Sequence, residues 1–266
     1  MQHAAGVQSH GRAASAPPLG VMMIRSLFFL LAVLPFGLSL PCAARAASPE
    51  IVFLAPTNHT MPLSQFQGGQ LSGGLIKDLG EAIAERAGRK ARFLSVPGKR
   101  VAYMLTAGQA DGVCYVLNYW IDGDFHWTRP FIPNGAIVAA RAEAPVIRAL
   151  GELADEPVGT VLGYRYPRAE EALGNRFLRN DAPDMAHNLR KLAVGRVRYA
   201  ITEELSLAWH LRNDKVAKLR NDLVFERFDA QCAFSRKSRV PAAEIDRAID
   251  ALIKDGSVTR ILARYR

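Results

Sequence analysis

The sequence contains few of the residues that build metal centres and nucleophilic active sites. Its 266 residues include three cysteines and six histidines. No Cys or His pair has the short spacing of zinc ligands, and the histidines are dispersed along the chain. No Ser/His/Asp arrangement or glycine-rich phosphate loop stands out. We therefore expect no metal ion, no cofactor and no hydrolytic or phosphoryl-transfer chemistry.

Long apolar runs and clusters of like charge are also scarce. After residue 46, no segment approaches the roughly 20 residues that a membrane-spanning helix needs. The net charge is +9, but Lys and Arg are scattered along the chain. Nucleic-acid-binding domains usually concentrate their basic residues in one patch or stripe. The sequence therefore predicts no nucleic-acid partner and no membrane span after residue 46.

One apolar run does occur near the start, at 27–40. Arg25 precedes it, and the small residues of Ala44-Arg45-Ala46 follow it. A positive charge, a short apolar run and a small-residue site together indicate a secretory signal peptide. We expect residues 1–46 to be removed by cleavage after Ala46, which would release about 220 residues into the periplasm. Residues 1–21 are interpreted as an extension upstream of the true start.

Two cysteines, Cys114 and Cys232, follow the predicted cleavage site. An oxidising compartment permits a disulfide between them. Disulfide geometry is restrictive, however, and the sequence gives no distance between the two residues. Both a disulfide and two buried free thiols stay open at this stage, and the free thiols are favoured.

Strand and helix patterns alternate along the chain in two series. The first series predicts strands at 51–55, 91–96 and 111–116 and helices at 75–87 and 100–107, with a loop at 56–74. The second predicts strands at 157–162, 198–202, 223–228 and 231–235 and helices at 166–173, 184–194 and 203–212. Helices at 241–254 and 257–265 close the chain. This alternation predicts an α/β fold with a parallel sheet covered by helices.

Several segments resemble, in order and spacing, the motifs of extracellular solute-binding proteins of family 3, the polar amino-acid type. Residues 74–79 resemble the opening of that family's first helix, and 100–112 resemble its "R…L…G…DG" element. Residues 127–131 resemble its "FSxPY" segment. Further similar segments are 153–159, 163–164, 192–201, 234–237 and 255–265. The match is colinear over nearly all of the chain after residue 46.

The resemblance implies a two-lobe periplasmic binding protein type II fold with two crossing hinge strands. Lobe 1 would hold 47–137 and 236–266, and lobe 2 would hold 138–235. The hinge strands would lie near 137–140 and 231–234. The lobes would close on a small solute, because ligand contacts to both of them favour the closed state.

The function implied is that of a monomeric periplasmic protein that captures a small polar solute, such as an amino acid, for a membrane ABC-type permease. We expect a binding protein rather than an enzyme. One alternative is an exported cyclohexadienyl or arogenate dehydratase-like enzyme on the same scaffold. The other is a ligand-sensing partner of a membrane receptor.

In the family, an Arg just before the "FSxPY" segment commonly pairs with the ligand carboxylate. Residues 119–124 contain no Arg, so another cation would have to take that role or the ligand would not be an α-amino acid. Arg100 and Arg165 are the candidates, because each lies between a predicted strand and a predicted helix. Such junctions face the ligand crevice in open α/β sheets, and helix starts favour anions.

The other candidate binding residues are aromatic, hydrogen-bonding or acidic. Aromatic rings commonly line small-molecule sites; the aromatic candidates are Tyr119, Trp120, Trp127 and Tyr164. Thr57 and Asn58 follow the first strand, as hydrogen-bonding groups or as plain loop residues. Glu203 would meet a ligand ammonium group, as acids at this position do in the family, or would be an acid favoured at a helix start. In the enzyme alternative, Glu203 would be the general acid.

Overall fold

The structure is a computed structural model that describes residues 49–213 and 218–266. The predicted signal peptide lies outside the described residues. The strands are β1 (Glu50–Pro56), β2 (Gln65–Gln67), β3 (Gln70–Gly73), β4 (Lys90–Val96), β5 (Gly112–Val116), β6 (Phe125–Trp127), β7 (Ile132–Arg141), β8 (Pro157–Val161), β9 (Leu178–Ala182), β10 (Tyr199–Glu203) and β11 (Leu219–Ser235). The helices are α1 (Leu75–Arg86), α2 (Val101–Thr106), α3 (Pro167–Leu173), α4 (Met185–Ala193), α5 (Glu204–Asn213), α6 (Ala242–Lys254) and α7 (Ser257–Ala263).

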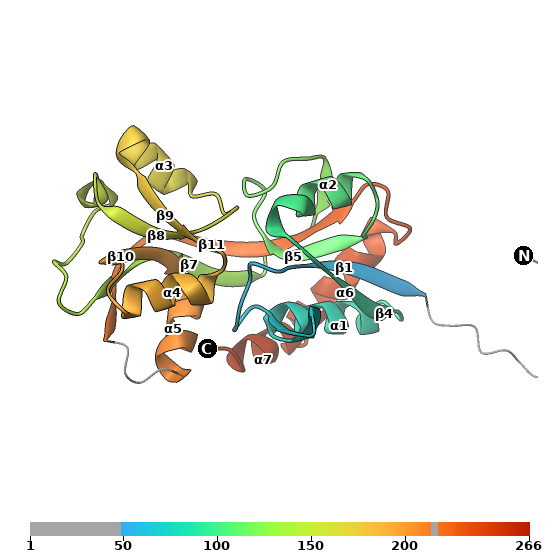
Figure 1. The fold of residues 1–266 in the computed structure, drawn as a ribbon. Helices are drawn as coiled ribbons and strands as arrows, with labels where there is room; N and C mark the ends of the chain where they lie inside the picture. The colour runs from blue at the N-terminus through green and yellow to red at the C-terminus, as the bar shows by residue number, and fades with distance from the viewer. Residues whose placement is uncertain (1–48, 214–217) are drawn as a thin grey trace, which may run out of the picture. The chain divides into compact units, whose positions relative to one another are not determined.

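The predicted α/β architecture is confirmed, with helices packed on a large mixed sheet (Figure 1). The strand order is β4-β1-β5-β11-β7-β10-β8-β9, and β6 also pairs with β11. The outer pairs are parallel, as predicted: β1 pairs with β4 and β5, and β8 pairs with β9 and β10. The prediction of a parallel sheet is wrong at the centre, where β7 and β11 run antiparallel to each other and to their neighbours.

Strand β11 joins the two ends of this sheet. Its residues up to Ala230 pair with β7, and those from Gln231 onward pair with β5 and β6. The sequence predicted two strands here, but hydrogen bonding to successive partners carries a single strand past the polar residues between them. We call β1, β4, β5 and β6 the first half of the sheet, and β8, β9 and β10 the second half. Both halves connect through β7 and β11.

Four short strands were not predicted: β2, β3, β6 and β9. The segment 56–74, expected to be a loop, contains the β2–β3 hairpin. Gly68 and Gly69 form its turn with positive φ angles of 57° and 77°, which glycine adopts without steric cost. Strand β9 pairs only with β8, and most of its residues are exposed or half-buried. The sequence of β9 is mostly polar and lacks the apolar pattern from which a strand is predicted.

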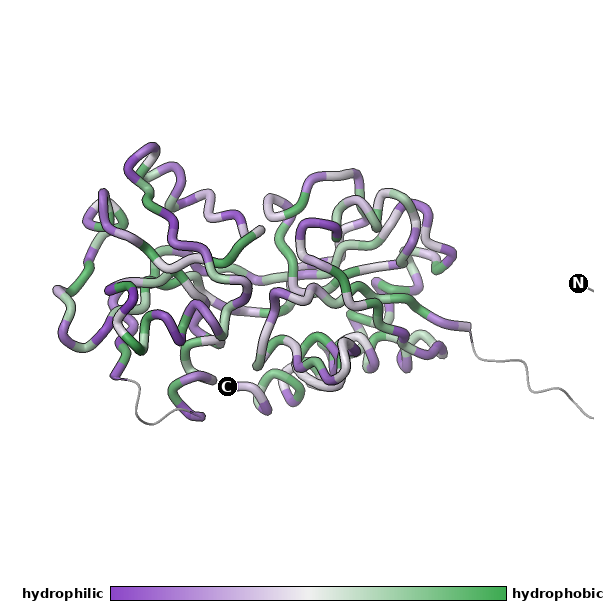
Figure 2. Tube along the Cα trace, viewed as in Figure 1, coloured by the Kyte–Doolittle hydropathy of each residue, from purple (hydrophilic) through white to green (hydrophobic). Residues whose placement is uncertain are grey.

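The first half of the sheet is covered by α1, whose apolar residues recur at spacings of three and four. Leu75, Leu79 and Ile83 are fully buried, and they belong to the same core as Ile245 and Ile249 of α6. Figure 2 shows hydrophobic and hydrophilic residues alternating along the helices, as expected when one helix face packs on a sheet. No helix within 49–213 and 218–266 combines the length and apolar character that a bilayer span requires.

The favoured interpretation of two free thiols is wrong. Cys114 of β5 and Cys232 of β11 form a disulfide, with Cα atoms 4.0 Å apart. The two residues are direct partners in the antiparallel ladder between these strands. Strand register therefore supplies the proximity, which a sequence separation of 118 residues conceals.

Candidate functional site

A cavity of about 100 Å³ lies between the two halves of the sheet, where the parallel strands end. Asn58 and His59 come from the segment after β1, and Trp120 from the segment after β5. The opposite side is formed by the loop after β8 and by the end of β10. In open α/β sheets, ligands bind outside the carboxyl ends of the strands, so this is where the topology favours a binding site.

Aromatic rings make up much of the lining. The His59 ring is perpendicular to two tyrosine rings, with ring centroids 6.2 Å from Tyr115 and 5.9 Å from Tyr164. The ring centroids of Trp120 and Phe228 lie 5.4 Å apart. The aromatic lining residues are Tyr115, Trp120, Tyr164, Tyr166, Phe225 and Phe228. Together they give the cavity an apolar wall with a few polar groups set into it, which is the usual composition of a small-molecule site.

Glu203 is the buried acid of the cavity. It is the last residue of β10 and only 7% exposed. Burial raises the pKa of Glu203 to about 7, because a charged carboxylate loses its hydration there. The hydroxyl of Ser206 donates a hydrogen bond to its Oε2, at 3.1 Å. Burial, followed by the charge of Glu203, also raises the pKa of Tyr164 well above its ordinary value.

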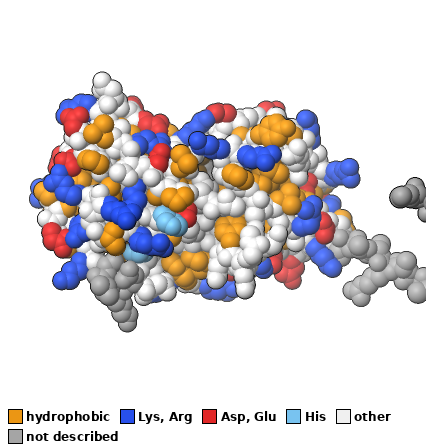
Figure 3. All heavy atoms as spheres, in the orientation of Figure 1, with side chains coloured by type: hydrophobic (Ala, Val, Ile, Leu, Met, Phe, Trp, Pro, Cys, Tyr) orange, Lys and Arg blue, Asp and Glu red, His pale blue; other side chains and the backbone are white. Residues whose placement is uncertain are grey.

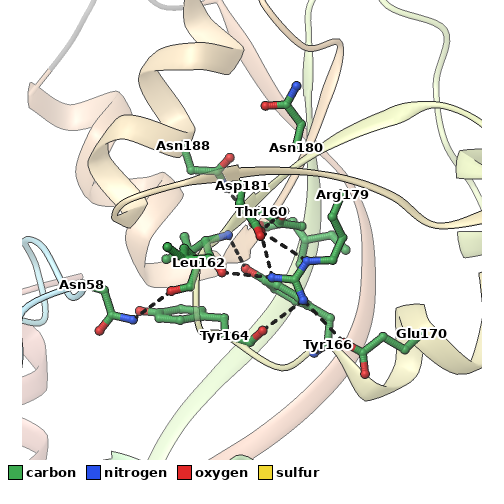
Figure 4. Close-up of polar contacts among 12 residues, drawn as sticks. Asn58, Thr160, Leu162, Tyr164, Tyr166, Glu170, Arg179, Asn180, Asp181 and Asn188 are labelled. Atoms are coloured by element: carbon green, nitrogen blue, oxygen red, sulfur yellow. Dashed lines mark hydrogen bonds and ion pairs between the residues drawn. The ribbon is translucent and has the colours of Figure 1, made fainter. Parts of the chain in front are cut away.

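Two neighbouring polar residues carry atoms without partners. Asn58 is 9% exposed, and its Nδ2 donates a hydrogen bond to the carbonyl of Leu162 at 3.4 Å (Figure 4). Its Oδ1 has no hydrogen-bond partner among the described residues, and the same holds for Nδ1 of His59. Burial lowers the pKa of His59 to about 4, so its imidazole is neutral at pH 7. Each residue therefore keeps hydrogen-bonding capacity at the cavity.

Arg179 of β9 holds the loop that carries Tyr164 and Tyr166. Its guanidinium donates to the carbonyls of Val161 and Tyr164, at 3.1 and 3.2 Å (Figure 4). It also lies 5.0 Å from the ring centroid of Tyr166 and pairs with Asp181. The hydroxyl of Tyr166 accepts a hydrogen bond from the backbone N–H of Val161. These contacts fix the aromatic loop before any ligand is bound.

Arg165, a predicted carboxylate ligand, is occupied by an acid of the opposite half. Its guanidinium forms a two-pronged ion pair with Asp122, and one prong measures 2.9 Å. Hydrogen bonding from Arg165 lowers the pKa of Asp122. Both side chains are largely exposed, at 45% and 78%, so the pair lies at the cavity mouth. Asp122 stands within 119–124, the segment just before the residues 127–131 that resemble the "FSxPY" motif.

The structure brings five of the nine predicted residues to the cavity. They are Asn58, Trp120, Tyr164, Arg165 and Glu203. Their role in ligand binding stays a prediction, as does that of the remaining four.

The other four predicted residues do not line the cavity. Thr57 and Arg100 are exposed, and the N–H of Thr57 donates to the carbonyl of Val96. Trp127 packs against Phe125 in the first half of the sheet, with ring centroids 6.1 Å apart. Tyr119 is not among the lining residues, but its hydroxyl donates a hydrogen bond to Glu226, which lines the cavity, at 2.6 Å.

Sequence reasoning missed several lining residues. His59 directly follows Asn58 after the first strand, and that position alone would have nominated it. Tyr115 lies inside a buried strand with a positive φ of 65°, a conformation that no sequence pattern revealed. Phe225 and Phe228 belong to β11, which the sequence predicted as two separate strands at 223–228 and 231–235.

Within 49–213 and 218–266 there is no group of three or more His, Cys, Asp or Glu side chains placed to hold a metal ion. On the face shown in Figure 3, Lys and Arg side chains are dispersed and acidic side chains lie among them.

No family model matches the sequence, and no curated protein matches it either. Solved structures do match the fold. AbpA from Streptococcus pneumoniae, an amino acid ABC transporter substrate-binding protein bound to L-arginine, superposes with a TM-score of 0.68. It is 18% identical, and the match covers 81% of this chain and 94% of AbpA.

Two further structures also match the fold. A histidine kinase sensor domain similar to periplasmic binding proteins has a TM-score of 0.68 and 19% identity, covering 83% of this chain and 97% of its own. AncCDT-1, an ancestral amino acid-binding protein and precursor of cyclohexadienyl dehydratase, has a TM-score of 0.67 and 15% identity, with coverages of 81% and 95%. At these identities the likeness concerns the fold: the described chain has the periplasmic binding protein fold that the sequence predicted.

Proposed function

We propose that this protein is an exported, periplasmic solute-binding protein of family 3 that captures a small polar solute for an ABC-type permease. The observation that carries the proposal is the cavity, which has walls from both halves of the sheet and a buried acid, Glu203, in the wall of the second half. The likeness to AbpA supports the transport role.

Capture would work through contacts that the solute makes to both walls at once. A ligand that touches Asn58 and Trp120 on one side and Tyr164 and Glu203 on the other binds the closed state better than an open one. It therefore shifts the population toward closure by its difference in affinity. Strands β7 and β11 are the connections about which the two halves would move, and the lobe boundaries at 137 and 235 remain part of this proposal.

A dehydratase-like enzyme is the second candidate, and one observation favours it. A general acid works best when its pKa lies near the working pH, and the pKa of Glu203 is raised to about 7. The likeness to AncCDT-1 points the same way. A sensing role is a third candidate, which the likeness to a histidine kinase sensor domain supports.

A thermal-shift screen of the purified protein against small metabolites tests the proposal. Binding at one hundred times Kd stabilises the folded state by about 2.7 kcal/mol, which raises Tm measurably. Each hit is then examined by small-angle scattering, where capture predicts a more compact particle. A panel of amino acids, amines, small acids and sugars that gives neither stabilisation nor compaction would refute the capture function. Turnover of prephenate or arogenate would instead establish the enzyme.

A further inference from the structure

The charges around the cavity are arranged asymmetrically. Its arginines, Arg165 and Arg168, are exposed, and Arg165 is already paired with Asp122. Among the described lining residues, the buried side chains include the acid Glu203 and the neutral His59 but no Lys or Arg. A ligand group that enters this space therefore meets a carboxyl group and finds no buried cation.

The unpartnered atoms point to the same kind of ligand. The carbonyl of Leu162 can only accept, so the Asn58 amide must turn its Nδ2 toward it and leave the acceptor Oδ1 without a partner. Nδ1 of His59 is also unpartnered, and a neutral imidazole has one donor and one acceptor nitrogen, so Nδ1 is an acceptor in one of the two tautomers. Glu203 has acceptor capacity beyond the bond from Ser206. Asn58, His59 and Glu203 all line the cavity, so these buried polar atoms lie within its wall, where a donor-rich ligand would satisfy their unused acceptor capacity.

The aromatic wall adds a third, independent attraction. The faces of Trp and Tyr rings attract cations within about 6 Å, and the effect grows when water is excluded. Tyr115, Trp120 and Tyr164 line the same cavity as Glu203, and burial keeps the two tyrosine hydroxyls protonated by raising their pKa. The rings therefore provide neutral, electron-rich surfaces beside the acid.

We infer that the ligand is an organic cation without a carboxylate, an amine or guanidine that presents several N–H donors to Glu203, Asn58 and His59 within the aromatic wall. This inference rests on the proposed function and names the solute class. An ammonium group has three donors and no acceptor, which complements the unpartnered acceptors. A carboxylate on the same ligand would lose its hydration in the cavity with no buried cation to pair with, and burying an unpaired charge is costly.

Matched pairs of amines and their carboxylated counterparts test the inference by titration calorimetry on the purified protein. The pairs are agmatine and L-arginine, cadaverine and L-lysine, putrescine and L-ornithine, and tyramine and L-tyrosine, with succinate and benzoate as acids. The best-binding amine should bind about tenfold or more tightly than its amino-acid partner. If an amino acid or an acid binds as tightly or more tightly, the inference is wrong while solute capture stands. If no compound binds, here or in the broader metabolite screen, both proposals fail.

Variants of Glu203 test whether its carboxylate supplies the negative charge that pairs with the ligand. Glu203→Gln should weaken binding of the best amine about tenfold or more, and Glu203→Asp should give an intermediate affinity because it keeps the charge one methylene away. Glu204→Gln is the matched control: Glu204 is the next residue, but it pairs with Arg227 and does not line this cavity. Its affinity should equal that of the unmodified protein. Unchanged amine affinity in a folded Glu203→Gln variant would overturn the assignment.

Discussion

The pKa of Glu203 makes a quantitative prediction about the variant Glu203→Gln. The carboxyl group has a pKa of 4.5 when unperturbed and about 7 in the folded protein. Between these pH values the folded state binds more protons than the unfolded state, so this group makes the protein less stable as the pH rises through the window. The gap corresponds to about 3 kcal/mol of unfolding free energy, present as a penalty above pH 7 and absent below pH 4.5.

Glutamine keeps the size of the side chain and an oxygen that can accept the hydrogen bond from Ser206, but it does not ionise. The unfolding free energy of Glu203→Gln minus that of the unmodified protein should therefore rise by about 3 kcal/mol between pH 4.5 and pH 8. Urea denaturation at several pH values measures this difference, and pH 4.5 is the internal reference because Glu203 is then largely protonated in the folded state.

The difference between the two proteins is needed because His59 acts in the opposite direction. Its pKa falls from 6.5 to about 4 on folding, so the unfolded state binds more protons in that window and stability rises with pH. In the unmodified protein the two groups partly cancel, whereas in the difference His59 drops out. Parallel stability curves for the variant and the unmodified protein would refute the argument that burial of Glu203 opposes its ionisation.

Three further predictions concern the disulfide, the mouth and the glycine beside Asn58. The double variant Cys114→Ser, Cys232→Ser should lose about 4–5 kcal/mol in urea denaturation, because the bond closes a loop across 118 residues, and an unchanged midpoint would contradict this. Arg165→Gln should weaken solute binding by less than about fivefold, because exposed ion pairs contribute little. The loss of affinity should be smaller at high salt, which screens such pairs. Arg100→Gln is its control, and a larger loss there would mean that the wrong arginine borders the site. Gly98→Ala should reduce solute affinity in calorimetry, since the added Cβ would lie 2.6 Å from the Asn58 amide, whereas Gly151→Ala meets nothing within 4 Å and should bind normally. Equal affinities for the two alanine variants would argue against a role for Asn58.

The sequence predicted well those helices and strands whose boundaries depend on residues close by in the chain. The apolar spacing in α1 and the glycine after it placed that helix within one residue of its observed end. The strand ends before Asn58 and beside Glu203 were also predicted. Asn58 was nominated as a hydrogen-bonding residue after the first strand, and Glu203 because the family that the sequence resembles often has an acid at this position. Edge strand β9 and the β2–β3 hairpin have few buried apolar residues, so the same reasoning passed over them.

What the sequence could not provide was register and long-range pairing. The Cys114–Cys232 bond depends on which residues of β5 and β11 lie opposite each other. Asp122 and Arg165 are 43 residues apart, and no sequence pattern predicts that they form an ion pair. Tyr115 and Phe228 were missed for the same reason, since their arrival at the cavity depends on how β5 and β11 are placed side by side.

The late position of β11 in the chain determines when the early residues can be buried. Strand β5 has β11 as its inner neighbour, and α1 packs in one core with α6, which begins only at Ala242. The hydroxyl of Tyr265 donates to Asp78 at 2.6 Å, across 187 residues of sequence. A chain emerging from the ribosome cannot complete the core around α1 until nearly all of it has been synthesised. The closing step of folding therefore falls at the C-terminal helices, an order that is compatible with the proposed export of an unfolded chain.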